Sequence, residues 1–257
     1  MKTLIVERDE RGVVSVVLNR PDKKNAIDYR MFEELLEVFT EVSESPSDRV
    51  LVLSGAGADF SSGADLAGDG TPDRHQLAQM RFYGSVALAL HQLPQPAIAK
   101  IRGVAVGAGL NLALGCDLIA ASSTARLSEI FARRGLSLDV GGSWLLPRLV
   151  GLHRAKELAL LADIISADEA ERIGLVNRVV PDADLDALVE DWAGRLAAGP
   201  PLALAMSKRL LNNAFGAGMA EALDAEGMAQ SVNTGSEDTK DAFRAFFQKR
   251  DPLFRGR

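Results

Sequence analysis

The sequence predicts an α/β fold followed by a helical C-terminal region. Up to about residue 150, short apolar strands alternate with segments of helical periodicity, in an order that approximates repeated ββα units. Two glycine-rich turns, at residues 55–66 and 103–109, each follow an apolar strand. From Val150 onward the pattern becomes mainly helical. We therefore expect a core of residues 1–195 and a helical region of residues 196–257.

The first half of the chain supplies the strands of this core. Strands are expected at residues 4–7, 13–18, 50–53, 97–101 and 117–121. The first two flank a turn and predict a hairpin. Asp28 is placed to cap a helix that stops at Ser45-Pro46, and a second helix is expected over residues 76–93. The polar segment 68–73 predicts a mobile loop.

Capping signals mark the helices of the second half. Ser166 and Glu169 have the spacing of a capping box, Pro200-Pro201 can begin a helix, and Ser236 can cap the last one. Aromatic residues in this last segment are expected to serve in packing; they are Phe243, Phe246, Phe247 and Phe254. The apolar side chains of this tail are expected to pack against another surface.

Composition excludes several classes of function. The 257 residues are 47% hydrophobic, and a net charge of -6 argues against a nucleic-acid or anionic-membrane surface. A single cysteine, Cys116, forms no internal disulfide, and no apolar run is long enough for a membrane span, so a cytoplasmic location is expected. The three histidines lack metal-ligand spacing, and no Gly-x-Ser-x-Gly elbow is present.

Five motifs occur in order along nearly the whole chain. They begin at Asn19 (Asn-Arg-Pro-x-Lys-Lys-Asn-Ala), Phe60 (Phe-Ser-x-Gly-Ala-Asp), Gly103 (the second glycine turn), Gly135 (Gly-x-x-x-Asp-x-Gly-Gly) and Lys249 (Lys-Arg-x-Pro-x-Phe-x-Gly). Together they resemble the crotonase family of acyl-CoA enzymes, the enoyl-CoA hydratases and isomerases. The resemblance implies a crotonase-like spiral of ββα repeats, a C-terminal trimerisation region, and a homotrimer or hexamer. It also implies an acyl-CoA substrate with no metal or redox cofactor.

The family's shared chemistry is stabilisation of a thioester enolate by two backbone amides. By position the resemblance assigns them to Ala64 and Ala108, one in each glycine turn. Backbone donors suit this role because they are fixed before reaction. The alternative is that both are ordinary turn alanines.

The resemblance also implies where coenzyme A binds. It assigns the loop containing Lys24 and Ala26, then Ser62 and Asp65 near the adenine, and Lys249 or Arg250 from a neighbouring subunit. Lys24 is the expected phosphate contact, since an ammonium group suits a phosphate charge. A solvated lysine pair would look the same in sequence.

The acid-base residues depart from the hydratase pattern. The first hydratase glutamate corresponds to Asn111 and the second to Phe131. Glu129 is two residues from the second position and is expected to lie elsewhere. Asp139 remains, and its motif resembles that of the single-aspartate isomerases of the family, including ring-epoxide and Δ3,Δ2-type isomerases. Asp139 could instead be the N-cap of a helix containing Ser143 to Leu146.

These features predict an acyl-CoA isomerase that moves a double bond or opens a ring epoxide, with Asp139 as its proton carrier. One alternative is an enoyl-CoA hydratase with a reduced acid-base set, in which Asn111 positions the water. Another is a non-catalytic acyl-CoA-binding scaffold. The sequence does not define the acyl group or the pathway.

Overall fold

The computed structural model describes residues 1–67, 73 and 75–257. The predicted loop at 68–73 therefore lies outside the described residues, apart from Asp73. No helix in the described ranges is long and apolar enough to cross a membrane.

A six-stranded sheet forms the centre of the molecule, in the order β1-β2-β3-β4-β6-β9. Its strands are β1 (Leu4–Arg8), β2 (Val13–Leu18), β3 (Val50–Gly55), β4 (Ala97–Ile101), β6 (Leu118–Ser122) and β9 (Arg178–Val180). The predicted hairpin is confirmed, because β1 and β2 pair antiparallel, and the other neighbours pair parallel. A small second sheet, ordered β5-β7-β8, contains β5 (Val104–Val106), β7 (Arg126–Ser128) and β8 (Ile165–Ser166).

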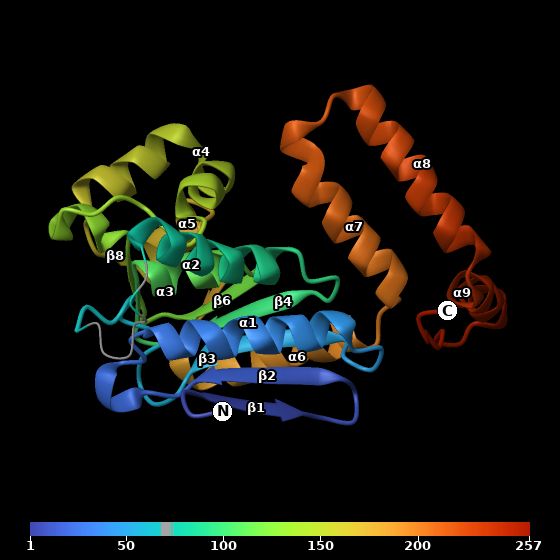
Figure 1. Ribbon diagram of the computed structural model, residues 1–257. Helices are drawn as coiled ribbons and strands as arrows, with labels where there is room; N and C mark the ends of the chain where they lie inside the picture. The colour runs from blue at the N-terminus through green and yellow to red at the C-terminus, as the bar shows by residue number, and fades with distance from the viewer. Residues whose placement is uncertain (68–72, 74) are drawn as a thin grey trace.

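Helices cover both faces of the large sheet (Figure 1). On one face lie α1 (Tyr29–Glu44), α2 (Gln76–His91) and α3 (Ala108–Leu114), and on the other lies α6 (Leu185–Ala197). Alternate residues of one strand face opposite layers: Leu51 joins the core under α1, whereas Val52 joins the cluster under α6. This two-sided burial explains why the central strands are almost wholly apolar.

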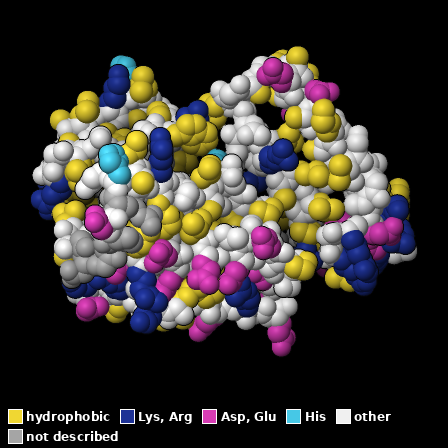
Figure 2. Space-filling view, in the orientation of Figure 1, with side chains coloured by type: hydrophobic (Ala, Val, Ile, Leu, Met, Phe, Trp, Pro, Cys, Tyr) yellow, Lys and Arg dark blue, Asp and Glu magenta, His cyan; other side chains and the backbone are white. Residues whose placement is uncertain are grey.

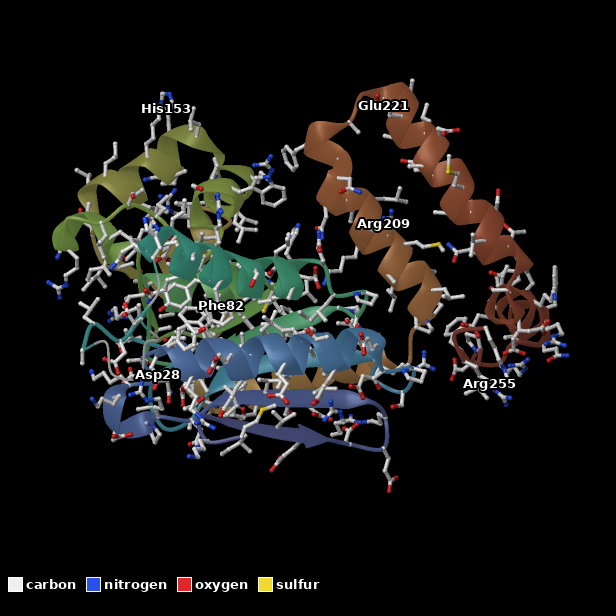
Figure 3. All side chains as sticks on the ribbon, in the orientation of Figure 1. Asp28, Phe82, His153, Arg209, Glu221 and Arg255 are labelled. Carbon is white, nitrogen blue, oxygen red and sulfur yellow. The ribbon has the colours of Figure 1, made fainter. Side chains whose placement is uncertain are left out.

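The first two helices also pack through aromatic rings. Phe82 points from α2 toward α1 (Figure 3), where its ring centroid lies 5.0 Å from that of Tyr29. Phe32 of α1 stacks on Tyr83 of α2 at 4.2 Å. Asp28 caps α1 as predicted, accepting a hydrogen bond of 2.8 Å from the Met31 amide.

Two further helices and three of the four short 3-10 turns among the described residues belong to the core. The helices are α4 (Gly142–Leu161), which is interrupted at Gly151, and α5 (Ala167–Arg172). The turns are η1 (Pro21–Lys23), η2 (Ile130–Arg134), η3 (Asp182–Asp184) and η4 (Ala214–Gly216), the last between α7 and α8. Ser166 caps α5 as predicted, by accepting from the Glu169 amide at 3.2 Å.

The last three helices stand apart from the core (Figure 1). They are α7 (Pro201–Asn213), α8 (Met219–Gly235) and α9 (Glu237–Gln248), and neither α7 nor α8 contains a buried residue. One link to the core is an ion pair of 2.7 Å between Lys208 and Asp117. Figure 2 shows apolar side chains spread over this arm, and the expected packing residues Phe246 and Phe247 are nearly four-fifths exposed. The two rings contact each other edge to face, with centroids 5.6 Å apart, and remain largely exposed in the single chain.

Candidate active site

The two glycine turns predicted to form the site are joined by a short parallel bridge. Ser61 donates from its amide to Val104 O at 2.9 Å, and Val106 donates to Ser61 O at 3.1 Å. The fit is close, because a Cβ added to Gly109 would lie 2.5 Å from Ser61 Oγ. A side chain at residue 109 would thus push the turns apart.

Gly63 and Gly107 direct the following amides into the same region. Both have positive φ, at 91° and 54°. A Cβ on Gly63 would lie 2.9 Å from Val106 O and 3.7 Å from the Ala108 nitrogen, so the two turns approach at this point. Among the described residues, neither the Ala64 nor the Ala108 amide donates a hydrogen bond. Two such free donors can hold negative charge that develops on an oxygen atom.

A third segment, residues 23–27, is bound to the first glycine turn. Ile27 donates to Gly63 O at 2.8 Å and accepts from the Asp65 amide at 2.9 Å. Ser62 donates to Lys24 O from its amide and to Lys23 O from its hydroxyl group. The segments expected to bind coenzyme A therefore form one continuous surface beside Ala64.

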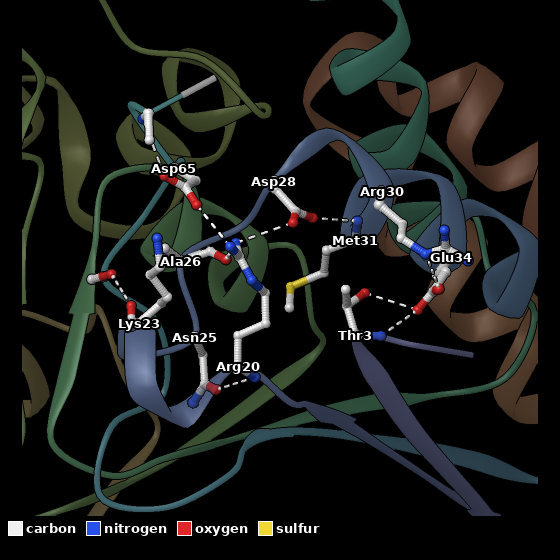
Figure 4. Close-up of polar contacts among 12 residues, drawn as sticks. Thr3, Arg20, Lys23, Asn25, Ala26, Asp28, Arg30, Met31, Glu34 and Asp65 are labelled. Atoms are coloured by element: carbon white, nitrogen blue, oxygen red, sulfur yellow. Dashed lines mark hydrogen bonds and ion pairs between the residues drawn. The ribbon is translucent and has the colours of Figure 1, made fainter. Parts of the chain in front are cut away.

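Arg20 holds this surface together, although no local sequence pattern predicts this role. Its guanidinium group pairs with Asp65 at 2.8 Å and Asp28 at 3.2 Å, and donates to Ala26 O at 2.7 Å (Figure 4). Hydrogen bonds from the Ala67 amide and from Arg20 keep the pKa of Asp65 below its usual range. The Asp65 carboxylate is therefore already paired with Arg20 and the Ala67 amide. The motif beginning at Asn19 contains Arg20 but does not reveal this geometry.

The two lysines expected at coenzyme A lie far apart in the single chain. Lys24 adopts a left-handed conformation (φ 50°), and its side chain is 63% exposed, with Asp59 Oδ2 at 3.8 Å. Lys249 is the C-cap of α9, at the right of Figure 1, whereas η1 is the short blue turn at the left. Lys249 of the same chain therefore cannot meet a ligand held by Lys24 in this conformation.

Asp139 does not cap the helix that follows it. The N-cap of α4 is Gly141, with no side-chain capping bond, and Asp139 contributes only its main-chain oxygen, to the Gly142 amide at 2.9 Å. Asp139 Oδ1 is buried without a partner, and burial raises the pKa of this carboxyl group to about 6. Val140 has φ 46°, a conformation that is costly for a β-branched residue. The helix-cap interpretation is therefore wrong.

Asn111 connects Asp139 to the second glycine turn. It lies one helical turn after Ala108, is buried, and donates from Nδ2 to Asp139 O at 3.0 Å. Gly142 accommodates its amide group, because a Cβ there would approach Asn111 Nδ2 to 2.4 Å. Glycine at position 142 is required by this contact.

Glu129 belongs to the same site, contrary to the expectation that it lies elsewhere. It is 1% exposed, neither of its carboxyl oxygens has a hydrogen-bond partner, and Asn111 and Asp139 both influence its ionisation. Burial raises its pKa to about 8; the Asn111 amide acts in the opposite direction, and the charge of Asp139 adds a smaller increase. Periodicity could not show this position, because η2 begins directly after Glu129 and turns the chain. Phe131 is also buried, and its ring would lie 3.8 Å from a Cβ on Gly107.

The sequence resembles known proteins over nearly its whole length. The sequence profile described as enoyl-CoA hydratase/isomerase matches residues 8–257. The chain is 36% identical to the 1,2-epoxyphenylacetyl-CoA isomerase of Escherichia coli (strain K12), with 100% of each chain covered. It is 33% identical to the crotonyl-CoA hydratase of Syntrophomonas wolfei, with 98% of each covered.

Comparison with solved structures leads to the same family. The fold resembles the crystal structure of an enoyl-CoA hydratase from Bacillus anthracis, with a TM-score of 0.94, 32% identity, and coverage of 99% of this chain and 100% of that one. The predicted α/β spiral is confirmed. The chain belongs to the enoyl-CoA hydratase/isomerase family, the crotonases, whose members act on acyl-CoA thioesters.

Proposed function

We propose that the protein is an acyl-CoA isomerase that moves a double bond, or opens a ring epoxide, through a thioester enolate. The observation that carries this proposal is the state of Asp139. Its carboxyl group is half-buried, with Oδ1 fully enclosed, accepts no hydrogen bond from the described residues, and caps no helix. A buried carboxyl group with a raised pKa, near two free backbone donors, is typical of a general base.

In the proposed reaction, ionised Asp139 removes a proton from C2 of a 3-enoyl thioester. The electrons of the C2–H bond move toward the thioester oxygen, where the Ala64 and Ala108 amides stabilise the charge. Asp139 then returns the proton at C4, and the double bond forms between C2 and C3. Loss of one such amide typically costs about 3 kcal/mol of transition-state stabilisation.

The coenzyme A moiety is proposed to lie along the surface formed by residues 23–27 and 62–65. Lys24 is the proposed phosphate contact, because its exposed ammonium group has only a distant carboxylate neighbour. Ala26 and Ser62 would present main-chain atoms, and Asp65 would act through its main chain because Arg20 occupies its carboxylate. Lys249 would reach a ligand only from a neighbouring subunit, in the proposed homotrimer or hexamer.

Hydration is the second candidate reaction, and Glu129 is the observation that favours it. Adding water requires one group to activate the water and another to protonate C2. The chain does contain a second buried carboxyl group in the site. A non-catalytic scaffold, the third possibility, would leave the costly burial of two carboxyl groups without a purpose.

A panel of acyl-CoA thioesters tests the proposal. Each 3-enoyl and 2-enoyl ester is incubated with wild-type protein and with Asp139→Asn, and the products are separated by chromatography. Isomerisation that exceeds hydration, and that is lost in Asp139→Asn, supports the isomerase. Dominant hydration favours the second candidate, and binding without turnover favours the scaffold.

A further inference from the structure

Unpartnered polar atoms gather at one point in the protein interior. Six buried side-chain nitrogen or oxygen atoms in the described ranges lack a hydrogen-bond partner. Four of the six belong to the site: Asn111 Oδ1, both carboxyl oxygens of Glu129, and Asp139 Oδ1. All four are oxygens, so these unpartnered atoms are acceptors unless one of them carries a proton. Buried polar groups rarely remain unsatisfied, so this concentration requires an explanation.

A proton on Glu129 supplies the missing donor. A neutral carboxylic acid has one O–H donor, whereas its ionised form only accepts hydrogen bonds. Burial makes the ionised form of Glu129 costly, and the charge of nearby Asp139 adds to that cost. Asp139 is the charged group that acts on Glu129, whereas the Asn111 amide beside it is neutral.

The chain path directs this donor toward Asn111. Glu129 directly follows β7, whose last residue Ser128 accepts a hydrogen bond of 2.9 Å from the Gly107 amide. Glu129 is therefore held beside the first turn of α3, which contains Asn111. The Asn111 amide lies close enough to the Glu129 carboxyl group to lower its pKa, an effect that opposes the larger effect of burial. Asn111 Nδ2 uses one of its two hydrogens in the bond of 3.0 Å to Asp139 O, and Asn111 Oδ1 remains an unpartnered acceptor.

We propose that Glu129 is a positioning residue that acts as a neutral acid: its O–H donates to Asn111 Oδ1, and the fixed Asn111 amide in turn holds the main chain of Asp139. Loss of the Glu129 proton would turn this donor into an anion facing an acceptor and a second carboxylate. The hydrogen-bonded link from Glu129 through Asn111 to Asp139 would then loosen. Ionisation of Glu129 therefore lowers the reaction rate at alkaline pH, although Glu129 exchanges no proton with the substrate.

Two substitutions separate this role from a structural one. Glu129→Gln keeps a neutral donor of the same length, so it should retain kcat at neutral pH within about threefold, whereas Glu129→Ala should lower kcat roughly tenfold with KM nearly unchanged. Wild-type kcat should fall above about pH 8, the region where Glu129 loses its proton, and Glu129→Gln should abolish that fall. A Glu129→Gln variant as inactive as Asp139→Asn would make Glu129 a proton donor and overturn the proposal, as would an unchanged alkaline fall.

The kinetic test rests on the proposed isomerase function, but a second measurement does not. Infrared difference spectra of the substrate-free protein at neutral pH should show a protonated-carboxyl band in wild type that is missing from Glu129→Gln. Absence of that band in wild type would disprove the neutral acid, whatever reaction the enzyme performs. If the band is present but no thioester is isomerised, only the proposed function fails.

Discussion

Asn111 Nδ2 donates a hydrogen bond of 3.0 Å to the main-chain oxygen of Asp139. This contact joins α3, which begins with the Ala108 amide, to the segment that contains the unpartnered Asp139 carboxyl group. The proposed enolate donor and the proposed base are therefore held in a fixed relation by one side chain. Reaction rates depend strongly on such positioning.

The contact between Asn111 and Gly142 predicts a non-additive pair of substitutions. Gly142→Ala would place a Cβ 2.4 Å from Asn111 Nδ2 and should destabilise the protein by about 1–3 kcal/mol. Asn111→Ala should cost about 1–2 kcal/mol, because Asp139 O loses a donor. In the double variant the new methyl group has room, so the combined loss should be smaller than the sum. Urea unfolding of the four proteins measures this difference, and strict additivity would contradict the predicted clash.

Substitution of Lys24 tests the proposed phosphate contact. Lys24→Gln should weaken binding of coenzyme A esters by roughly tenfold, the cost of one charge-assisted contact. Binding of pantetheine esters, which lack the nucleotide phosphates, should remain unchanged. Lys156→Gln, at an exposed position on α4, is the matched control. Calorimetric titration distinguishes the two ligands, and equal weakening of both would remove Lys24 from the phosphate site.

Most of the fold could be predicted from the sequence because its signals are local. Alternating burial, the Asp28 cap and the proline stop at residue 46 act within a few residues, and the structure confirms the elements they indicate. The spiral path came from the resemblance. Strand order depends on contacts between distant segments, such as β4 beside β6, which no local pattern specifies.

Within the candidate site, the sequence predicts the backbone of the glycine turns better than it predicts the positions of individual side chains. The glycine turns brought Ala64 and Ala108 together because positive φ and close packing both demand glycine. Glu129 was excluded on regular strand or helix spacing, but the chain changes from β7 to η2 at that residue. The role of Arg20 is not predictable from a local pattern, because its ion pairs with Asp28 and Asp65 depend on the fold.

The exposed helical arm predicts an oligomer. Phe246 and Phe247 are 78% and 79% exposed, and α7 and α8 bury no residue within the chain. Aromatic rings this exposed are usually covered by another protein surface. Light scattering at micromolar concentration should give three or six times the 27.5 kDa chain mass. Phe246→Ser with Phe247→Ser should shift the assembly toward monomer, while a wild-type monomer would contradict the expectation.

The raised pKa values of Glu129 and Asp139 predict a loss of stability as pH rises. Both groups have a higher pKa in the folded than in the unfolded state, so the folded protein binds more protons. For Glu129, stability should decline from about pH 4.5 to about pH 8, by up to about 1.4 kcal/mol per pH unit. Glu129→Gln should flatten this decline and be the more stable protein at neutral pH. Urea unfolding at fixed protein concentration across this range tests it, and parallel curves would show that Glu129 is ionised when folded.

Asp139→Asn is the most direct test of the proposed base. Asparagine keeps the size of the side chain but cannot accept a proton at neutral pH. Because Asp139 caps no helix and its carboxyl group accepts no hydrogen bond from the described residues, this variant should fold normally and bind coenzyme A esters with nearly unchanged affinity.

Isomerase turnover of Asp139→Asn should fall by roughly 10²-fold or more, the lower end of general acid-base contributions. The wild-type rate should rise with pH through about 6, as the Asp139 carboxyl group ionises, and the residual rate of the variant should lack that rise. Removing a buried charge should also leave the melting temperature equal to or above that of wild type. A lowered melting temperature with unchanged turnover per folded molecule would assign Asp139 to structure, and the proton carrier would then have to be Glu129, the other buried carboxyl group of the site.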